Sequence, residues 1–393
     1  MTDLLRQEIA TAAHTLVVKV GTRILTGSDG LLDQQRVAAL AEELHQVIAS
    51  GRKVALVSSG AVGAGMGRLG IKRRPSDLAQ LQAIAAVGQS ALVEAYDRNL
   101  RLHGHHAAQV LLIADDLDNR TRYLNIRNTL LTLLELGAVP IINENDTVSV
   151  EELQTTFGDN DRLAAMVTNL IRAPLLVLLS DVDGLYDGDP ADPQSKVIPT
   201  VTHLDESTWA LVRDRSTGLS KGGMASKLKA ATMAVTAGEN VIIASGKQPG
   251  TLARILAGEQ VGTLFVAQGE SVSSWKRWLG LTAQPRGRLV VDDGARRAIE
   301  HQGRSLLAIG IVNVDGAFRK GDVVALDDSR GQEFARGLSN YTAEEIQRIK
   351  GLKTDQIAAA LGHCPHDEVI HRDHLARGQG SGVSGQGKEA SGP

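Results

Sequence analysis

Residues 15–60 read TLVVKVGTRILTGSDGLLDQQRVAALAEELHQVIASGRKVALVSSG and decide the fold. Residues 15–20 and 53–58 are short and largely apolar, which is typical of strands covered on both faces. Between them, apolar residues recur at helical spacing, with Asp33 placed to cap the helix and Gly51 just beyond its end. The stretch therefore predicts a strand, a helix and a second strand parallel to the first.

The same alternation continues as far as residue 244. Four further apolar runs predict strands, at residues 107–113, 138–143, 175–180 and 240–244. Segments with helical periodicity lie between them. An alternation of this length predicts an α/β fold, in which a mostly parallel open sheet carries helices on both faces.

The sequence changes in character after Phe265. Short runs separated by Asp-Gly, Lys-Gly and Arg-Gly turns predict a small β-rich domain over residues 288–376. Its expected strands are residues 289–291, 305–308, 323–326 and 332–336. We therefore expect a first domain over 1–267, a linker over 268–287, the β-rich domain, and a disordered Gly/Ser-rich tail over 377–393.

Composition excludes several classes of protein. The 393 residues include 42 Lys and Arg and 45 Asp and Glu, and the net charge of −3 argues against a main function on nucleic acid or an anionic membrane. The single cysteine, Cys364, excludes an internal disulfide and a multi-cysteine metal site. The strongest apolar run, residues 175–179, is far shorter than the about 20 residues of a membrane helix. We expect a cytoplasmic protein without a membrane segment.

Polar or glycine-rich clusters follow four of the predicted strands. They are Lys19-Val20-Gly21-Thr22, the run from Ser58 to Gly65, Asn143-Glu144-Asn145-Asp146, and Ser180-Asp181. Each alone has an ordinary explanation as an edge lysine, a helix cap or a solvated turn. Ligands of open parallel sheets bind outside the carboxyl ends of the strands, so four such clusters are expected to converge on one site.

A second glycine-rich segment, from Gly218 to Lys227, precedes an alanine-rich helical run. Adjacent glycines at a helix start allow backbone N–H groups to surround an anion, and the alternative is a flexible loop with an incidental lysine. No P-loop motif occurs, and the G-x-G-x-x-G match at Gly65–Gly70 lies too far from the first strand for a dinucleotide site. His103, His105 and His106 are interpreted as a solvated helix end, and no metal-ligand cluster is predicted.

Taken in order, six motifs resemble those of the glutamate 5-kinase family within the amino-acid kinase superfamily. The motifs are Val18-Lys19-Val20-Gly21-Thr22, Val57-Ser58-Ser59-Gly60-Ala61, Ala86-Val87-Gly88-Gln89, Asn143-Glu144-Asn145-Asp146, Gly158-Asp159-Asn160-Asp161 and Gly222-Gly223-Met224-x-x-Lys227. The later pattern Val314-Asp315-Gly316-x-Phe318-x-x-Gly321-Asp322 is similar to that of a PUA domain. The resemblance implies ATP-dependent phosphorylation of the side-chain carboxylate of L-glutamate, the first step of proline biosynthesis.

The resemblance also implies roles for individual residues. Lys19 and Lys227 would flank the transferring phosphoryl group, with Asp159 holding the two lysines. The implied glutamate-binding residues are Ser59, Gly60, Asn143, Asp146, Asn160 and Asp161. The implied ATP-binding residues are Lys19, Ser180, Asp181, Lys221, Gly222, Gly223, Met224, Ala225, Ser226 and Lys227. Lys221 departs from the Thr or Ser usual in the family, which puts a hydroxyl contact to the nucleotide in doubt.

These residue types suit the implied reaction. A carboxylate is already an anionic nucleophile and needs no general base, so the protein mainly has to position the reactants and neutralise charge. Mg²⁺ is expected with the nucleotide and not at a protein metal site. The family further implies feedback inhibition by proline, transfer of the product to γ-glutamyl phosphate reductase, and a homo-oligomer, dimeric or tetrameric.

Two alternatives remain open. The first is a kinase of the same fold for another acid, such as acetylglutamate, aspartate, carbamate or a nucleotide. The second is an RNA-binding protein that acts through the PUA-like domain. Residues 286–373 contain 13 Lys and Arg against 14 Asp and Glu, whereas RNA binders usually show a basic excess, so this alternative is disfavoured.

Overall fold

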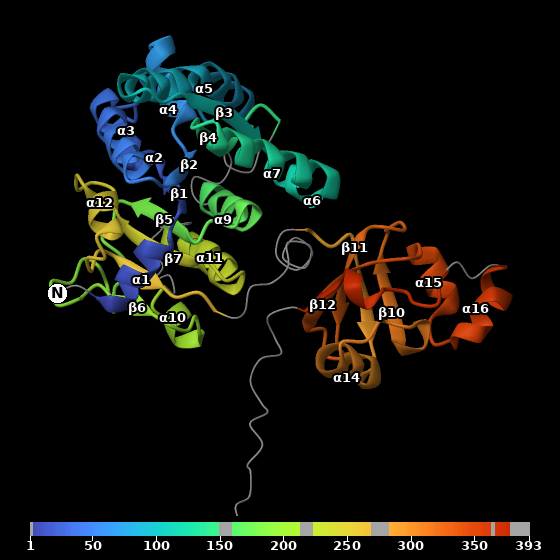
Figure 1. Ribbon diagram of the computed structural model, residues 1–393. Helices are drawn as coiled ribbons and strands as arrows, with labels where there is room; N and C mark the ends of the chain where they lie inside the picture. Colours follow the sequence, from blue (N-terminus) through green and yellow to red (C-terminus); the bar gives the residue numbers. More distant parts are fainter. Residues whose placement is uncertain (1–2, 149–158, 213–222, 269–282, 363–365, 378–393) are drawn as a thin grey trace, which may run out of the picture. The chain divides into compact units, whose positions relative to one another are not determined.

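The computed structural model describes residues 3–148, 159–212, 223–268, 283–362 and 366–377 (Figure 1). The chain divides into two compact units, residues 1–271 and 272–393. Most of the linker expected over 268–287 and nearly all of the tail expected over 377–393 lie outside the described residues. Within the described part, no helix is both long and apolar enough to span a membrane.

The first unit contains an eight-stranded sheet in the order β3-β4-β2-β1-β5-β7-β8-β6. The strands are β1 Thr15–Val20, β2 Lys53–Ser58, β3 Ala107–Leu112, β4 Val139–Glu144, β5 Leu175–Ser180, β6 Thr200–Val201, β7 Asn240–Ser245 and β8 Thr263–Phe265. Every pairing is parallel except that of β7 with β8. The predicted α/β class is confirmed, and the two strands that the sequence did not indicate, β6 and β8, are only two and three residues long.

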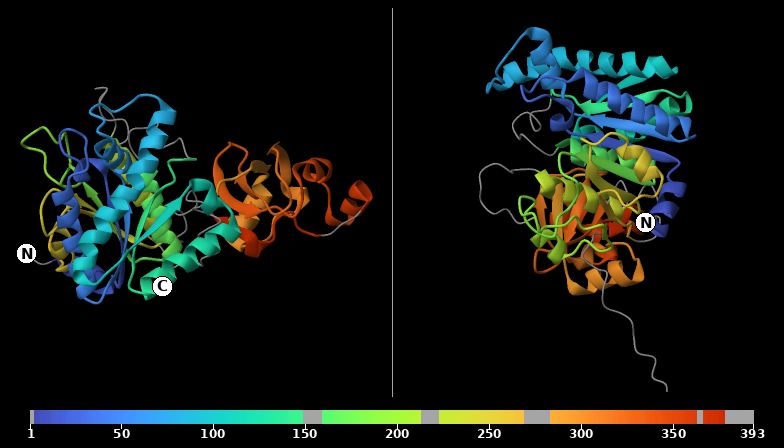
Figure 2. Two further views of the ribbon diagram at one scale, coloured as in Figure 1. Left: turned by 90° about the horizontal axis from the view of Figure 1, so that it is seen from above. Right: turned by 90° about the vertical axis from the view of Figure 1, so that its left-hand side faces the viewer.

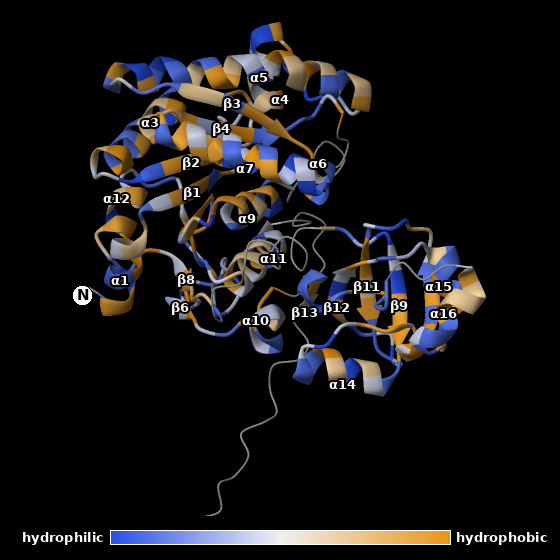
Figure 3. Ribbon diagram, turned by 45° about the vertical axis from the view of Figure 1, so that its right-hand side comes forward, coloured by the Kyte–Doolittle hydropathy of each residue, from blue (hydrophilic) through white to orange (hydrophobic). Residues whose placement is uncertain are grey.

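Helices cover both faces of this sheet (Figures 1 and 2). They are α1 Leu4–Ala12, α2 Thr22–Leu25, α3 Gln34–Ala49, α4 Ala61–Leu69, α5 Leu78–Leu100, α6 Ala114–Asp118, α7 Arg120–Glu135, α9 Asp159–Ile171, α10 Glu206–Ala210, α11 Gly223–Thr236 and α12 Thr251–Leu256, with a 3₁₀ turn at Arg101–His103. The strands are apolar, whereas α3 and α5 carry polar residues on their outer sides (Figure 3). Asp33 caps α3 as predicted, because its carboxylate accepts hydrogen bonds from the backbone N–H groups of Gln35 and Arg36.

Strand alternation places Lys19 on the face that α9 covers. Leu16, Val18 and Val20 of β1 belong to the core formed with α3, α5 and α12. Successive side chains of a strand point to opposite faces, so Lys19 points to the other face of the sheet. There α9 packs against β1, β5 and β2, and α11 packs against α9 and β7.

The strand order creates a switch point at β1. After β1 the chain forms β2 beside it, then β3 at the edge of the sheet and β4 between β3 and β2, and it then crosses to β5 on the other side of β1. Connections that leave in opposite directions open a crevice at the carboxyl ends of these strands, which is where open α/β sheets bind ligands.

Arg6 of α1 joins the start of the chain to the far end of the first unit. Its side chain is buried, and its guanidinium donates hydrogen bonds to the carbonyl oxygens of Pro199 and Val261 at 2.6 Å, of Gly262 at 3.0 Å and of Glu259 at 3.4 Å. A buried cation is costly unless its donors are satisfied. Here the four carbonyl groups accept from Nη1 and Nη2, and Nε lies 3.8 Å from the Asp3 carboxylate.

The second unit has a five-stranded sheet in the order β10-β9-β11-β12-β13, parallel only between β9 and β11. The strands are β9 Gly287–Val291, β10 Ile311–Gly316, β11 Val323–Asp327, β12 Glu333–Leu338 and β13 Leu375–Arg377, and the helices are α14 Asp293–Gln302, α15 Ala343–Ile349 and α16 Thr354–Leu361. The strand predicted at residues 305–308 is wrong. Leu306 makes only an isolated bridge to Ile370, and Ala308 begins a 3₁₀ turn.

Candidate active site

Two lysines and one aspartate meet at the switch point. Lys19 of β1 lies 2.6 Å from Oδ1 of Asp161, and Lys227 of α11 lies 3.1 Å from Oδ2 of the same carboxylate. Asp161 is in the first turn of α9, the helix that lies between β1 and α11. The side chains are 8%, 12% and 2% exposed in the order Lys19, Lys227, Asp161, so this is a buried charge cluster with one more positive than negative charge.

Burial and ion pairing shift the pKa values of Asp161 and Lys227 in opposite directions. Burial alone would raise the pKa of Asp161, but the ammonium groups of Lys19 and Lys227 hold that pKa below its usual value. Burial lowers the pKa of Lys227, and the Asp161 carboxylate opposes this shift. Pairing thus favours the charged forms of Asp161 and Lys227 against the effect of burial, and two ammonium groups beside one carboxylate suit an anionic ligand.

A chain of buried polar side chains lies on the neighbouring strands. Nδ2 of Asn160 donates to Oγ of Ser59 at 2.8 Å and to Oδ1 of Asn143 at 3.0 Å. Nδ2 of Asn143 donates to Oε1 of Gln89 at 2.9 Å. These four residues come from the end of β2, from β4, from α9 and from α5, and all are less than 7% exposed.

Gly60 shapes the turn between Ser59 and α4. Its φ of +111° lies in a region that residues with a side chain rarely adopt, so glycine is required there. Gly60 caps α4 without a side-chain hydrogen bond. The free N–H groups of the first turn therefore face the carboxyl edge of the sheet, where a helix N-terminus favours an anion.

Asp146 follows β4 by two residues and is buried, at 7% exposed. Burial raises the pKa of its carboxyl to about 6, although the charge of Arg74 opposes the shift. A carboxylate with this pKa would gain from a cationic partner such as an ammonium group.

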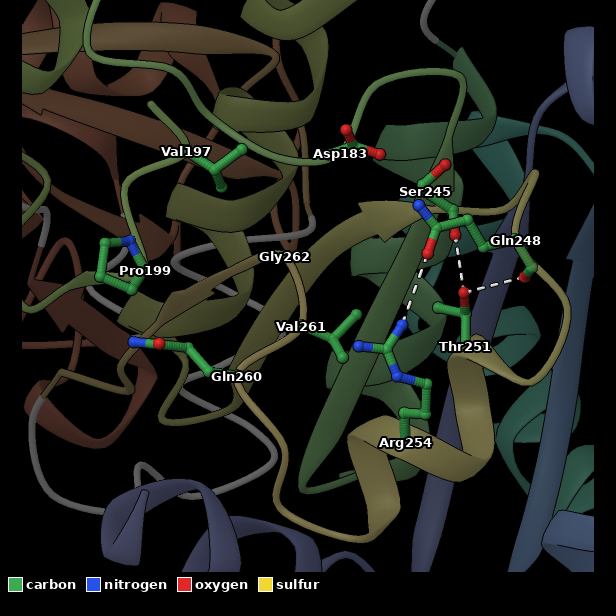
Figure 4. A pocket seen from close by; sticks show the side chains of 10 residues that line it. All are labelled: Asp183, Val197, Pro199, Ser245, Gln248, Thr251, Arg254, Gln260, Val261 and Gly262. Atoms are coloured by element: carbon green, nitrogen blue, oxygen red, sulfur yellow. Dashed lines mark hydrogen bonds between the residues drawn. The ribbon is translucent and has the colours of Figure 1, made fainter. Parts of the chain in front are cut away.

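A second polar region lies at the ends of β5 and β7. Oγ of Ser180 donates to Asp181, and the guanidinium of Arg23 pairs with Asp181 at 3.0 Å. Burial would raise the pKa of Asp181, but the hydrogen bond from Arg23 keeps it low. Next to this strand end a cavity of about 310 Å³ is lined by polar side chains, among them Asp183 and Ser245 (Figure 4).

The structure brings most of the predicted residues to one edge of the sheet. Lys19, Lys227 and Asp161 form one cluster, and Ser59, Asn143 and Asn160 form the other. The first turn of α11 contains Gly223, Met224, Ala225 and Ser226. Lys221 and Gly222 lie outside the described residues, as does the side chain of Asp159.

Three contacts of the site were not predicted from the sequence. Asp161 makes the contact to both lysines, a role that the resemblance gave to Asp159. Gln89 was visible only as the last residue of a motif, and Arg23 gave no signal because an exposed arginine after a strand is common.

Sequence models of two known families match this chain. A sequence model described as "Amino acid kinase family" matches residues 14–245, and one described as "PUA domain" matches residues 287–361. The first unit is thus of the amino-acid kinase class.

Curated proteins that are similar over nearly the whole chain identify its family within this class. A protein of Rhodopirellula baltica named Glutamate 5-kinase is 50% identical over 94% of this chain and 95% of its own length. Proteins of the same name from Methylococcus capsulatus and Moorella thermoacetica are each 46% identical, over 92% of this chain and 97% and 96% of their own lengths. The chain belongs to the glutamate 5-kinase family.

Proposed function

We propose that this protein transfers the terminal phosphoryl group of ATP to the side-chain carboxylate of L-glutamate, forming γ-glutamyl phosphate at the start of proline biosynthesis. The observation that carries this proposal is the contact of Lys19 and Lys227 with the same Asp161 carboxylate, beside a cluster of buried amides. The shared name of the relatives supports glutamate over the other acids considered.

The reaction joins two anions, and their repulsion is the main obstacle. The attacking carboxylate needs no general base, so the contribution of the protein is positioning and charge neutralisation. Lys19 and Lys227 approach from β1 and α11, and their donors can follow the negative charge as it moves to the leaving oxygen. Asp161 keeps the two ammonium groups at fixed positions before the nucleotide binds.

The amide cluster and Asp146 would recognise the amino acid. Ser59, Asn143 and Asn160 provide hydroxyl and amide groups that can hold a carboxylate. Asp146 would pair with the ammonium group, and so distinguish an amino acid from a plain dicarboxylate. The N-terminus of α4 adds backbone donors on the same side.

ATP would bind across Ser180, Asp181 and the first turn of α11. A cavity with a mixed polar and apolar lining, which includes Asp183 and Ser245, supports this placement because it offers room next to the ends of β5 and β7. Mg²⁺ would enter with the phosphates, because it is usually held through one or two carboxylates and the phosphates of the substrate. Bound there, Mg²⁺ would neutralise phosphate charge.

Further parts of the proposal rest on the family. Proline would inhibit the enzyme, γ-glutamyl phosphate reductase would receive the reactive product, and the protein would form a homo-oligomer. We also propose that residues 1–267 form the catalytic domain and that the PUA-like domain, residues 288–376, lies beyond the linker.

Trapping the product tests the function directly. The purified protein is incubated with ATP, Mg²⁺, hydroxylamine and one acid at a time, and the hydroxamate is measured. Hydroxamate with L-glutamate, and little with aspartate, acetylglutamate or carbamate, is the expected result. Equal or greater turnover with another acid would reject glutamate as the substrate, and no ATP-dependent product with any acid would reject the kinase.

A further inference from the structure

Gln89 lies behind the candidate substrate site and has no role in the function proposed above. It belongs to α5 and is 6% exposed. Its Oε1 accepts the hydrogen bond from Nδ2 of Asn143, whereas its Nε2 has no hydrogen-bond partner in the part of the chain that the structure describes. Burying the Nε2 group of a glutamine without a hydrogen bond costs free energy. We therefore expect the contact of Oε1 with Asn143 to offset that cost.

The hydrogen bond of Gln89 fixes the orientation of the next amide. An asparagine has an acceptor on one side and a donor on the other. Because Oε1 of Gln89 takes the NH₂ group of Asn143, the carbonyl oxygen of Asn143 points to Asn160 and accepts its NH₂ group. Turning the Asn143 amide over would bring two NH₂ groups together. In this arrangement the Gln89 contact holds the Asn143 amide against Asn160, which in turn contacts Ser59.

Close packing of α4 and α5 holds Gln89 in place. A Cβ atom on Gly88 would overlap the carbonyl oxygen of Ala61, and one on Gly65 would overlap that of Ile84. The two helix backbones are therefore in direct contact beside Gln89, and Ala61 itself directly follows the Ser59-Gly60 turn. The residue that orients the amides thus stands on a rigid support.

We propose that Gln89 is a positioning residue for the acceptor substrate, an inference that rests on the proposed function. Its effect runs through Asn143 and Asn160 to the acid, and its hydrogen bond to Asn143 does not involve Lys19, Lys227 or Asp181. Loss of Gln89 should weaken binding of L-glutamate and leave binding of ATP as it is.

Steady-state kinetics of two matched variants test whether Gln89 affects the binding of L-glutamate and not that of ATP. Gln89→Met keeps the size of the side chain and removes the acceptor, and Gln80→Met makes the same change at an exposed position of the same helix. We expect Gln89→Met to raise the KM for L-glutamate about tenfold or more, as for a buried amide that loses its partner. The KM for ATP and the kcat at saturating glutamate should stay near those of the parent and of Gln80→Met. An unchanged KM for glutamate, or an equal rise for both substrates, would overturn the inference.

A spectroscopic measurement tests the hydrogen-bond chain without turnover. With ¹⁵N-asparagine labelling, the side-chain amide signals of Asn143 and Asn160 should shift in Gln89→Met and stay in place in Gln80→Met. Unshifted signals would overturn the inference even in an active enzyme, whereas absent glutamate turnover in the parent would reject only the proposed function. Should Gln89→Met fail to fold, Gln89→Glu keeps an acceptor toward Asn143 and is expected to preserve both signals; their loss would count against the proposal.

Discussion

Asp161 is the residue on which the charge arrangement depends. One carboxylate holds two buried ammonium groups, and each of the three groups would be costly to bury alone. Mutual pairing offsets that cost before a ligand binds. The lysines are therefore positioned before substrate arrives, which limits the reorganisation that phosphoryl transfer requires.

Replacing Lys227 should remove turnover without unfolding the protein. We expect Lys227→Met to lower kcat by about 10²–10³-fold, the usual cost of one donor aimed at developing charge. Lys229→Met is the matched control, because Lys229 is exposed on the same helix two residues later. Hydroxamate formation measures kcat and circular dichroism checks the fold; a folded Lys227→Met variant with near-normal kcat would remove the basis of the mechanism.

Asp146 should give glutamate binding a pH dependence. The carboxyl group has a pKa of about 6 before substrate binds, so it is ionised at pH 8 and increasingly protonated below pH 6. Only the ionised form pairs with an ammonium group. Below pH 6, kcat/KM for glutamate should fall about tenfold per pH unit, since this ratio reports the free enzyme.

Asp146→Asn provides the control for that profile. The variant should show a high KM for glutamate at pH 8 and no further fall that titrates near pH 6. A parent profile that stays flat from pH 8 to pH 5 would contradict the role of Asp146.

At the residue scale, the sequence predicts which residues gather but not which of them touch. The strand ends alone place Lys19, Ser59, Asn143 and Ser180 at one edge, because parallel strands share their carboxyl side. The contact of Asp161 with both lysines depends on how α9 is rotated against β1. Helix packing sets that rotation, and the residue types do not encode it.

At the scale of elements, α4 and α5 form the closest helix pair that supports the site. Gly65 and Gly88 allow the two backbones to touch, as the overlaps of an added Cβ atom show. The approach orders the turn that holds Ser59 and Gly60. It also explains a pair of glycines inside helices, where glycine otherwise lowers stability.

Gly88→Ala should therefore destabilise the fold. Its methyl group would overlap a backbone oxygen, which cannot move away as a side chain could, so we expect a loss of about 1–3 kcal/mol in the free energy of unfolding. Gly67→Ala is the control, because nothing lies near a Cβ at that position of α4, and it should be neutral or stabilising by up to about 1 kcal/mol. Urea denaturation measures both. Equal stability of the two variants would argue against the close helix contact.

Strands that are continuous apolar runs were predictable from the sequence, whereas short strands that form only by pairing with a neighbouring strand were not. The expected bounds of β1, β2 and β5 agree with the structure because each is a continuous apolar run. β6 and β8 are too short to show a period, and their partners decide that they are strands. Residues 305–308 have strand-like composition, but only Leu306 finds a partner across the chain.

At the scale of the whole molecule, the contacts described above for the candidate site join residues of the first unit. Gln268 is the last residue of the first unit that the structure describes, and its backbone N–H donates to the carbonyl oxygen of Val235 at 2.8 Å. The first unit has a core around β1 and a further cluster between α4 and α5, and the second unit has a core of its own. Two separate cores are typical of domains that fold independently.

A chain ending after Gln268 should therefore remain a kinase. We expect cooperative unfolding and a kcat close to that of the full chain, because no site residue is removed. Hydroxamate formation and thermal unfolding of both forms provide the measurement. A folded but inactive shortened chain would mean that the second unit completes the site.

The anchoring of Arg6 has a practical side for anyone who engineers this enzyme. Removing the residues that precede the first strand would take the Arg6 guanidinium away from the backbone oxygens at positions 199, 259, 261 and 262. Affinity handles are better added ahead of the first helix, whose cap, Asp3, lies near solvent. The first helix, α1, should therefore be kept in any engineered form of the protein, because it carries Arg6.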